Sequence, residues 1–206
     1  MPQHEHWGRV YEGFTEDRDI TTAAAIASIQ GHQGASLADR YTVAATAKHY
    51  IGDGATTIYH AIKAVGSDVE YAEDGCYAAM AADKAVVVVG EAPYAESLGD
   101  TDELGLSDEH KRLISGCKDL GKKVIVLLIS GRVLAVAEEL AESDAFIAAW
   151  LPGSEGAGVA DFLFSIGGFK PKGKSPYSWP ASLTDFPLAQ YAEHALFQFG
   201  YGLEDY

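Results

Sequence analysis

The chain has 206 residues, of which 48% are hydrophobic, enough for one large or two small globular domains with a substantial core. Its 30 acidic residues outnumber its 15 basic residues and give a net charge of −15, which argues against nucleic acid and anionic membrane surfaces as partners. No apolar run approaches about 18 residues, so we expect no membrane span, and the N-terminus contains no apolar signal-peptide core.

The N-terminal part of the chain mixes helical and extended patterns. Residues 16–34 begin with acids, continue with alanine-rich periodicity and predict a helix that ends near Gly31. The next three segments follow in order: a short strand leading into a glycine loop within 41–54, a helix over 57–66, and a short strand over 68–72.

From residue 84 onward, strands and helices alternate regularly. The apolar runs at 85–89, 122–130 and 145–150 predict strands, and the segments 107–121, 133–143 and 154–165 predict helices, with Ser107 as a cap. Continuous apolar strands indicate a sheet covered on both faces, and the alternation indicates parallel pairing. We therefore predict an α/β sandwich, a mostly parallel sheet with helices on both faces. The Pro-, Gly- and aromatic-rich stretch after Gly167 is expected to pack over this sheet.

Three polar loops follow predicted strands. They are 90–100 (GEAPYAESLGD), 130–132 (SGR) and 151–156 (LPGSEG). Ligands bind at the carboxyl ends of parallel strands, so these loops should share one rim. The rim would carry Glu91, Glu96, Asp100, Arg132 and Glu155. It could be the edge of an active site, or simple loop polarity with Ser154 or Glu155 capping a helix.

The cysteines and histidines indicate no metal or cofactor. Cys76 and Cys117 form no CxxC pair, and we expect both to be plain thiols. His4 and His6 are close, but no third ligand lies nearby in the sequence. The chain also lacks a GxGxxG motif or a P-loop at a strand–helix turn, which argues against a nucleotide-binding domain.

Four long motifs resemble the C-terminal α/β sandwich domain of family 3 glycoside hydrolases, the β-glucosidases and exo-β-glucanases. They are VVVVGEAPYAESLGD, VIVLLISGR, AAWLPGSEGAGVADFLF and FQFGYGLEDY, and the similarity extends over residues 57 to 206. Two earlier motifs, HWGRVYEGFTED and VAATAKHYIGDGATT, resemble segments of the family's catalytic barrel. We therefore divide the chain into a barrel-derived segment (1–57) and a sandwich domain (58–206) that together form one compact unit.

The resemblance implies β-glucoside hydrolysis with a pair of carboxylates. It places the general acid/base on Glu96 and the sugar contacts on Arg9, Lys48 and His49. A residue that donates a proton to the glycosidic oxygen needs a raised pKa, supplied by burial or by a neighbouring carboxylate. Glu91 and Asp100 are candidates for that neighbour, although Glu91 suits a structural role better because it directly follows the strand, where we expect it to bond the backbone. Glu155 is the competing acid.

The sequence departs from the family in lacking the barrel segment that carries the nucleophile. A complete barrel needs about 250 residues, and only the first 57 residues resemble barrel. The chain therefore resembles two joined pieces of such an enzyme, whether by deletion, engineering or natural truncation. Asp53 is the nearest substitute nucleophile, and a single acid with an activated water is another route to weak hydrolysis.

The competing hypothesis is a non-catalytic sugar-binding or structural remnant. We expect a small β-glucoside or oligosaccharide as ligand, and such a remnant would associate as a homo-oligomer that covers strand edges and the apolar surface meant for the missing barrel. The aromatic residues Trp179, Phe197, Phe199 and Tyr201 suit packing better than a sugar platform, whereas Trp150, at a strand's carboxyl end, could line a pocket. The family that the chain resembles is often secreted or periplasmic, and since we find no signal peptide in this sequence we make no prediction of its localisation.

Overall fold

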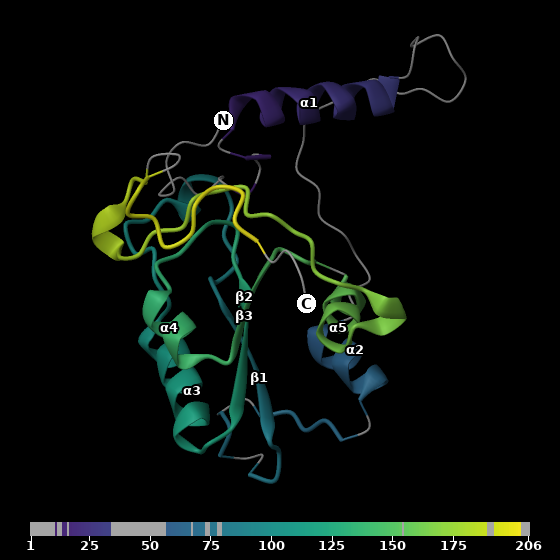
Figure 1. Cartoon of the computed structure of the whole chain (residues 1–206), viewed down its shortest axis with the longest axis vertical. Coiled ribbons are helices and arrows are strands. Elements are labelled where there is room, and N and C mark those ends of the chain that lie inside the picture. Colours follow the sequence, from purple (N-terminus) through teal and green to yellow (C-terminus); the bar gives the residue numbers. More distant parts are fainter. Residues whose placement is uncertain are drawn as a thin grey trace.

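The centre of the molecule is a sheet of three parallel strands, β1 (Lys84–Gly90), β2 (Lys123–Ile129) and β3 (Ala145–Trp150), in the order β1-β2-β3. The computed structural model describes residues 11, 14, 15, 17–33, 57–66, 68–72, 75–77, 80–153, 155–188 and 192–202. Helices α3 (Asp108–Asp119) and α4 (Ala137–Glu142) lie on one side of the sheet, and α2 (Ile58–Val65) and α5 (Gly156–Phe164) lie on the other (Figure 1). The predicted α/β sandwich is confirmed.

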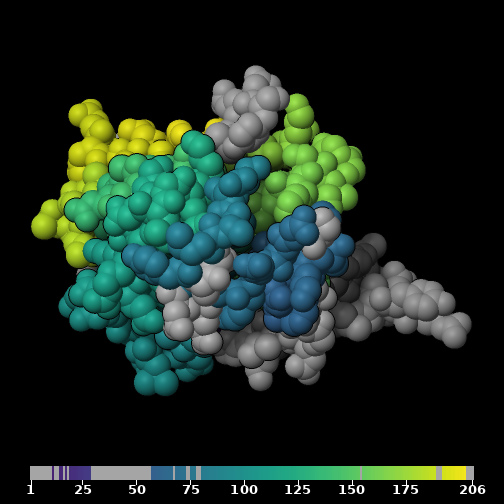
Figure 2. All heavy atoms as spheres, turned by 90° about the horizontal axis from the view of Figure 1, so that it is seen from below, coloured from purple at the N-terminus to yellow at the C-terminus, as the bar shows by residue number. Residues whose placement is uncertain are grey.

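The central strand β2 supplies the most deeply buried side chains. Val124, Val126, Leu127 and Leu128 are each no more than 1% exposed. Burying a valine or leucine contributes about 1.5–3 kcal/mol, so this strand dominates the core. The larger cluster packs on the α3 side, and a smaller one between α2, α5 and Val86 packs on the other. Viewed from below, the residues of α3 (teal) lie on the side of the molecule opposite to those of α2 (blue) and α5 (light green) (Figure 2).

Local capping explains where several helices begin. The Ser107 hydroxyl accepts the His110 N–H at the start of α3, as predicted, and Thr57 caps α2 in the same way. Asp17 accepts the N–H groups of Asp19 and Ile20 at the start of α1 (Arg18–Gln33). Helix α1 lies across the end of the molecule beyond the strands' carboxyl ends (Figure 1).

Two element predictions are wrong. Residues 68–72 form no strand, because no strand of the described chain pairs with them, and Val69 instead packs on the small cluster of α2 and α5. Helix α4 begins at Ala137 rather than near residue 133. The preceding residues stay extended because Ala135 donates to the carbonyl of Leu104 and forms a bridge with Gly105.

The prediction of two plain thiols is also wrong. Cys76 and Cys117 form a disulfide that links the segment before β1 to α3. The two cysteines are 41 positions apart, so only the packing of α3 beside the 75–77 turn brings them together. The spacing of the two cysteines in the sequence therefore did not predict that they form a disulfide.

The C-terminal segment runs over the carboxyl end of the sheet, as expected. Trp179 is 4% exposed and belongs to the core, and its backbone N–H donates to the carbonyl of Phe197. Phe197 stacks on Tyr201 with 4.3 Å between the ring centroids. Trp179 and Phe197 thus pack as predicted, whereas half of Tyr201 remains exposed.

Candidate active site

A buried ion pair joins the loops that follow β1 and β2. The Arg132 side chain is 1% exposed, and its Nε lies 2.9 Å from Oε1 of Glu91. Ser130 Oγ donates to Oε2 of the same carboxylate over 2.6 Å, and the Tyr94 hydroxyl donates to it over 3.2 Å. A buried guanidinium needs such a partner, because an unpaired charge inside a protein is strongly destabilising.

Arg132 also holds the far end of the 90–100 loop. Its Nη2 donates to the carbonyl of Gly99 over 2.6 Å, and its guanidinium carbon lies 4.4 Å from the centre of the Tyr94 ring. Burial, followed by the charge of Glu91, raises the pKa of Tyr94 to about 12. The Tyr94 hydroxyl therefore keeps its proton and remains a donor at neutral pH. We call Glu91, Tyr94, Ser130 and Arg132 the loop clamp.

The clamp determines how Glu96 is presented. Glu96 begins the short 3-10 helix η2 (Glu96–Gly99), whose last residue is the one that Arg132 holds. Its φ of 52° lies in the left-handed region, which costs a residue with a side chain about 1–2 kcal/mol. The Glu96 side chain is exposed, so the described residues do not provide the burial expected of a proton donor. Asp100 follows η2, and its N–H donates to the carbonyl of Ser97.

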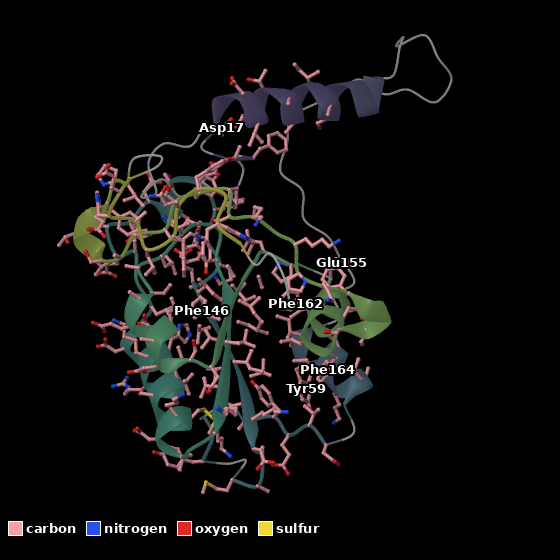
Figure 3. All side chains as sticks on the ribbon, viewed as in Figure 1. Asp17, Tyr59, Phe146, Glu155, Phe162 and Phe164 are labelled. Carbon is pink, nitrogen blue, oxygen red and sulfur yellow. A yellow bond between two sulfur atoms is a disulfide. The ribbon has the colours of Figure 1, made fainter. Side chains whose placement is uncertain are left out.

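Two of the predicted site residues, Trp150 and Glu155, flank the loop that follows β3. Trp150 adopts φ 53° after a register shift between β2 and β3, and its ring packs 6.2 Å from Trp179 and 6.1 Å from Tyr177, centroid to centroid. Glu155 is exposed at the start of α5 (Figure 3). Its side chain does not cap that helix, so the capping explanation fails for Glu155.

A pocket of about 270 Å³ opens at the carboxyl ends of β2 and β3. Phe14 and Leu151, at its wall, are about half exposed. Gly131 allows the N-terminal segment to approach, since a Cβ here would lie 2.9 Å from both Tyr11 Cβ and Tyr94 Oη. The pocket is lined by Tyr11, Phe14, Ser130, Gly131, Trp150, Leu151, Pro176 and Tyr177.

The predicted site residues therefore fall into three groups. Glu91 and Arg132 are in direct contact, Glu96 and Asp100 share the loop that they hold, and Trp150 lines the adjoining pocket. Four further residues, Arg9, Lys48, His49 and Asp53, lie outside the described residues. Sequence reasoning missed Tyr11, Tyr94, Ser130 and Tyr177; only Tyr94 and Ser130 stood in loops already singled out.

The described part of the chain contains no group of three or more His, Cys, Asp or Glu side chains arranged to hold a metal ion. Within the same residues, no helix combines the length and apolar character needed to cross a membrane. The groups that the structure describes at this edge are carboxylates, one buried guanidinium and aromatic rings.

Comparisons with known proteins agree on one family. Residues 20–205 match the model of the glycosyl hydrolase family 3 C-terminal domain. The chain is 34% identical over 118 residues to the periplasmic beta-glucosidase of Salmonella typhimurium, covering 56% of this chain and 15% of that protein. It is 34% identical over 134 residues to the lysosomal beta glucosidase of Dictyostelium discoideum, covering 61% of this chain and 16% of that one.

Solved structures of a glucanase and a beta-glucosidase are also similar to this chain. The exo-1,3/1,4-beta-glucanase of a Pseudoalteromonas species superposes with a TM-score of 0.66 at 38% identity, over 73% of this chain and 20% of that chain. The beta-glucosidase of Listeria innocua superposes with a TM-score of 0.63 at 24% identity, over 72% of this chain and 26% of that chain, which supports the fold alone. The chain spans about 15% of the length of the curated relatives it matches.

Proposed function

The chain belongs to glycosyl hydrolase family 3, and from this premise we propose that it acts in the hydrolysis of small β-linked glucosides or oligosaccharides, with Glu96 as general acid/base. The loop clamp is the observation that carries the proposal. Arg132 bonds the Glu96 loop at Glu91 and at Gly99, so a buried ion pair and a hydrogen bond hold this loop in place. Such support is what a reacting side chain requires, because small misplacements cost large factors in rate.

Glu96 would protonate the glycosidic oxygen as the bond to the sugar breaks. Arg9, Lys48 and His49 would hold the sugar hydroxyls, because charge-assisted hydrogen bonds suit a neutral, hydroxyl-rich ligand. Asp53 would supply the second carboxylate, and the exposed Glu155 is the acid that competes with Glu96 for the acid role. The aromatic pocket beside Trp150 offers apolar surface for the sugar or its aglycone.

The decisive experiment compares two β-glucosides with different leaving groups. Glu96→Gln should lower turnover of a disaccharide, whose leaving group needs a proton, by about 100-fold or more. It should lower kcat/KM for p-nitrophenyl β-glucoside much less, because kcat/KM reports the bond-breaking step and nitrophenolate leaves without a proton. Glu103→Gln, at another exposed glutamate nearby, is the matched control. An equal loss on both substrates would contradict the acid role.

The second candidate function is sugar binding without turnover. It is favoured by the aromatic lining of the pocket. Calorimetric titration of the wild-type protein with a β-glucoside tests it. Binding that Trp150→Ala weakens, together with turnover no faster than in buffer, would favour this function over hydrolysis.

A further inference from the structure

Strand β1 lies at the edge of the sheet, and its outer backbone groups have no partner within the described residues. The N–H of Glu91 donates to the carbonyl of Ile129, and the carbonyl of Asp83 accepts the N–H of Lys123. Odd-numbered residues of β1 therefore face β2, and even-numbered residues face outward, because successive peptide groups alternate in direction. No group of the described chain bonds to the outward N–H and C=O groups, which belong to Lys84, Val86, Val88 and Gly90.

The side chains of this edge are also incompletely covered. Val88 is 45% exposed, although Leu127, its register partner on β2, is completely buried. Val88 lies on the same face as Val86, which packs on the small cluster of α2 and α5. A flat apolar edge with open peptide groups is a surface that accepts another strand.

We propose that the outer edge of β1 pairs with β1 of a second copy of this chain, antiparallel about a two-fold axis at Val87. Val86 of each copy then stands opposite Val88 of the other, and Lys84 stands opposite Gly90. Each of these pairs has its peptide groups directed at the other strand, so all the outward groups become hydrogen-bonded. The two three-stranded sheets become one continuous sheet, and Val88 is covered.

Charge selects a second copy in this orientation. Lys84 is the only charged residue of β1, so the strand itself sets no two carboxylates against each other when two copies pair. Antiparallel pairing keeps the two exposed Lys84 side chains at opposite ends of the paired strands, and Asp83 of each copy stands opposite Glu91 of the other, whose charge is neutralised by Arg132. Parallel pairing would instead bring like charges together. A two-fold axis also closes the assembly at two copies.

The test begins with the mass of the purified chain by sedimentation equilibrium between about 1 and 100 µM. The wild-type protein should show twice the chain mass of 21.9 kDa. Val88→Lys should weaken dimerisation at least about 10-fold, since a charge is then buried opposite Val86. Val65→Lys is the matched control, because Val65 is 44% exposed on α2 and should leave the dimer intact.

A second variant and a hydrogen-exchange measurement test whether the loss of strand pairing, and not another effect of Val88→Lys, weakens dimerisation. Val88→Pro removes an outward N–H that pairs with nothing in the described monomer, and edge strands tolerate proline at such positions. Amide exchange of Lys84, Val86 and Gly90 should be slow in the wild-type protein and fast in both variants. A monomeric wild type, or a Val88→Lys dimer of unchanged affinity, would overturn the proposal. So would a monomer with slow exchange at these residues, because another segment of the same chain would then cover the edge.

Discussion

Replacing Arg132 by methionine tests whether the loop clamp holds the rim together. The substitution removes a guanidinium that is 1% exposed and leaves the Glu91 carboxylate, 16% exposed, without its ion-pair partner. It also leaves the Gly99 carbonyl without the donor at 2.6 Å. Removing one member of a buried pair costs about 3–5 kcal/mol. With a urea m-value of about 2 kcal/mol per molar, the unfolding midpoint should fall by roughly 2 M.

The assay is urea unfolding followed by the fluorescence of Trp150 and Trp179. Arg112→Met, at an exposed arginine of α3, is the control and should change stability by less than about 0.5 kcal/mol. In the double variant Arg132→Met with Glu91→Gln, the loss should be smaller than the sum of the single losses by about 1–3 kcal/mol, because the two groups are in contact. A cost below about 1 kcal/mol for Arg132→Met would refute the reasoning.

Two further substitutions probe packing and charge. Gly131→Ala should destabilise the protein by about 1–3 kcal/mol in thermal unfolding, because the new Cβ would lie 2.9 Å from Tyr11 and Tyr94, whereas Gly158→Ala, with open space around it, should not. Hydrogen bonds from Lys123, from the Val124 N–H and from Lys118 hold the pKa of Asp144 below its ordinary value. The stability that Asp144 contributes is therefore present above about pH 4 and is lost as the pH falls further, so Asp144→Asn should flatten the acid limb of a stability–pH curve.

The sheet was predictable because a strand that is buried on both faces appears in the sequence as a continuous apolar run. The three strands lie within two residues of their predicted bounds, since each is a continuous apolar run. The segment 68–72 has a similar local composition but no described strand beside it, and a strand exists only through its partner. Local sequence describes the propensity of a segment and not the presence of that neighbour.

The sequence predicted which residues lie together at the rim, but not what each of them contacts. Strand-end reasoning brought Glu91 and Arg132 to one edge, where they are in contact. It gave Arg132 no role beyond membership of the polar rim, whereas the structure buries it against Tyr94 and Gly99. The burial of an arginine depends on two loops meeting in space, and neither loop alone carries that information. Glu91 likewise bonds side chains, where a bond to backbone was expected.

The Cys76–Cys117 disulfide has a consequence for how the chain tolerates cleavage. It closes a covalent ring that contains β1, the Glu96 loop and α3. Leu98, 89% exposed, lies inside that ring, within η2. A protease that cuts there opens the ring but releases neither product, because the disulfide still joins them. The nicked protein would run as one chain until it is reduced, and then as two.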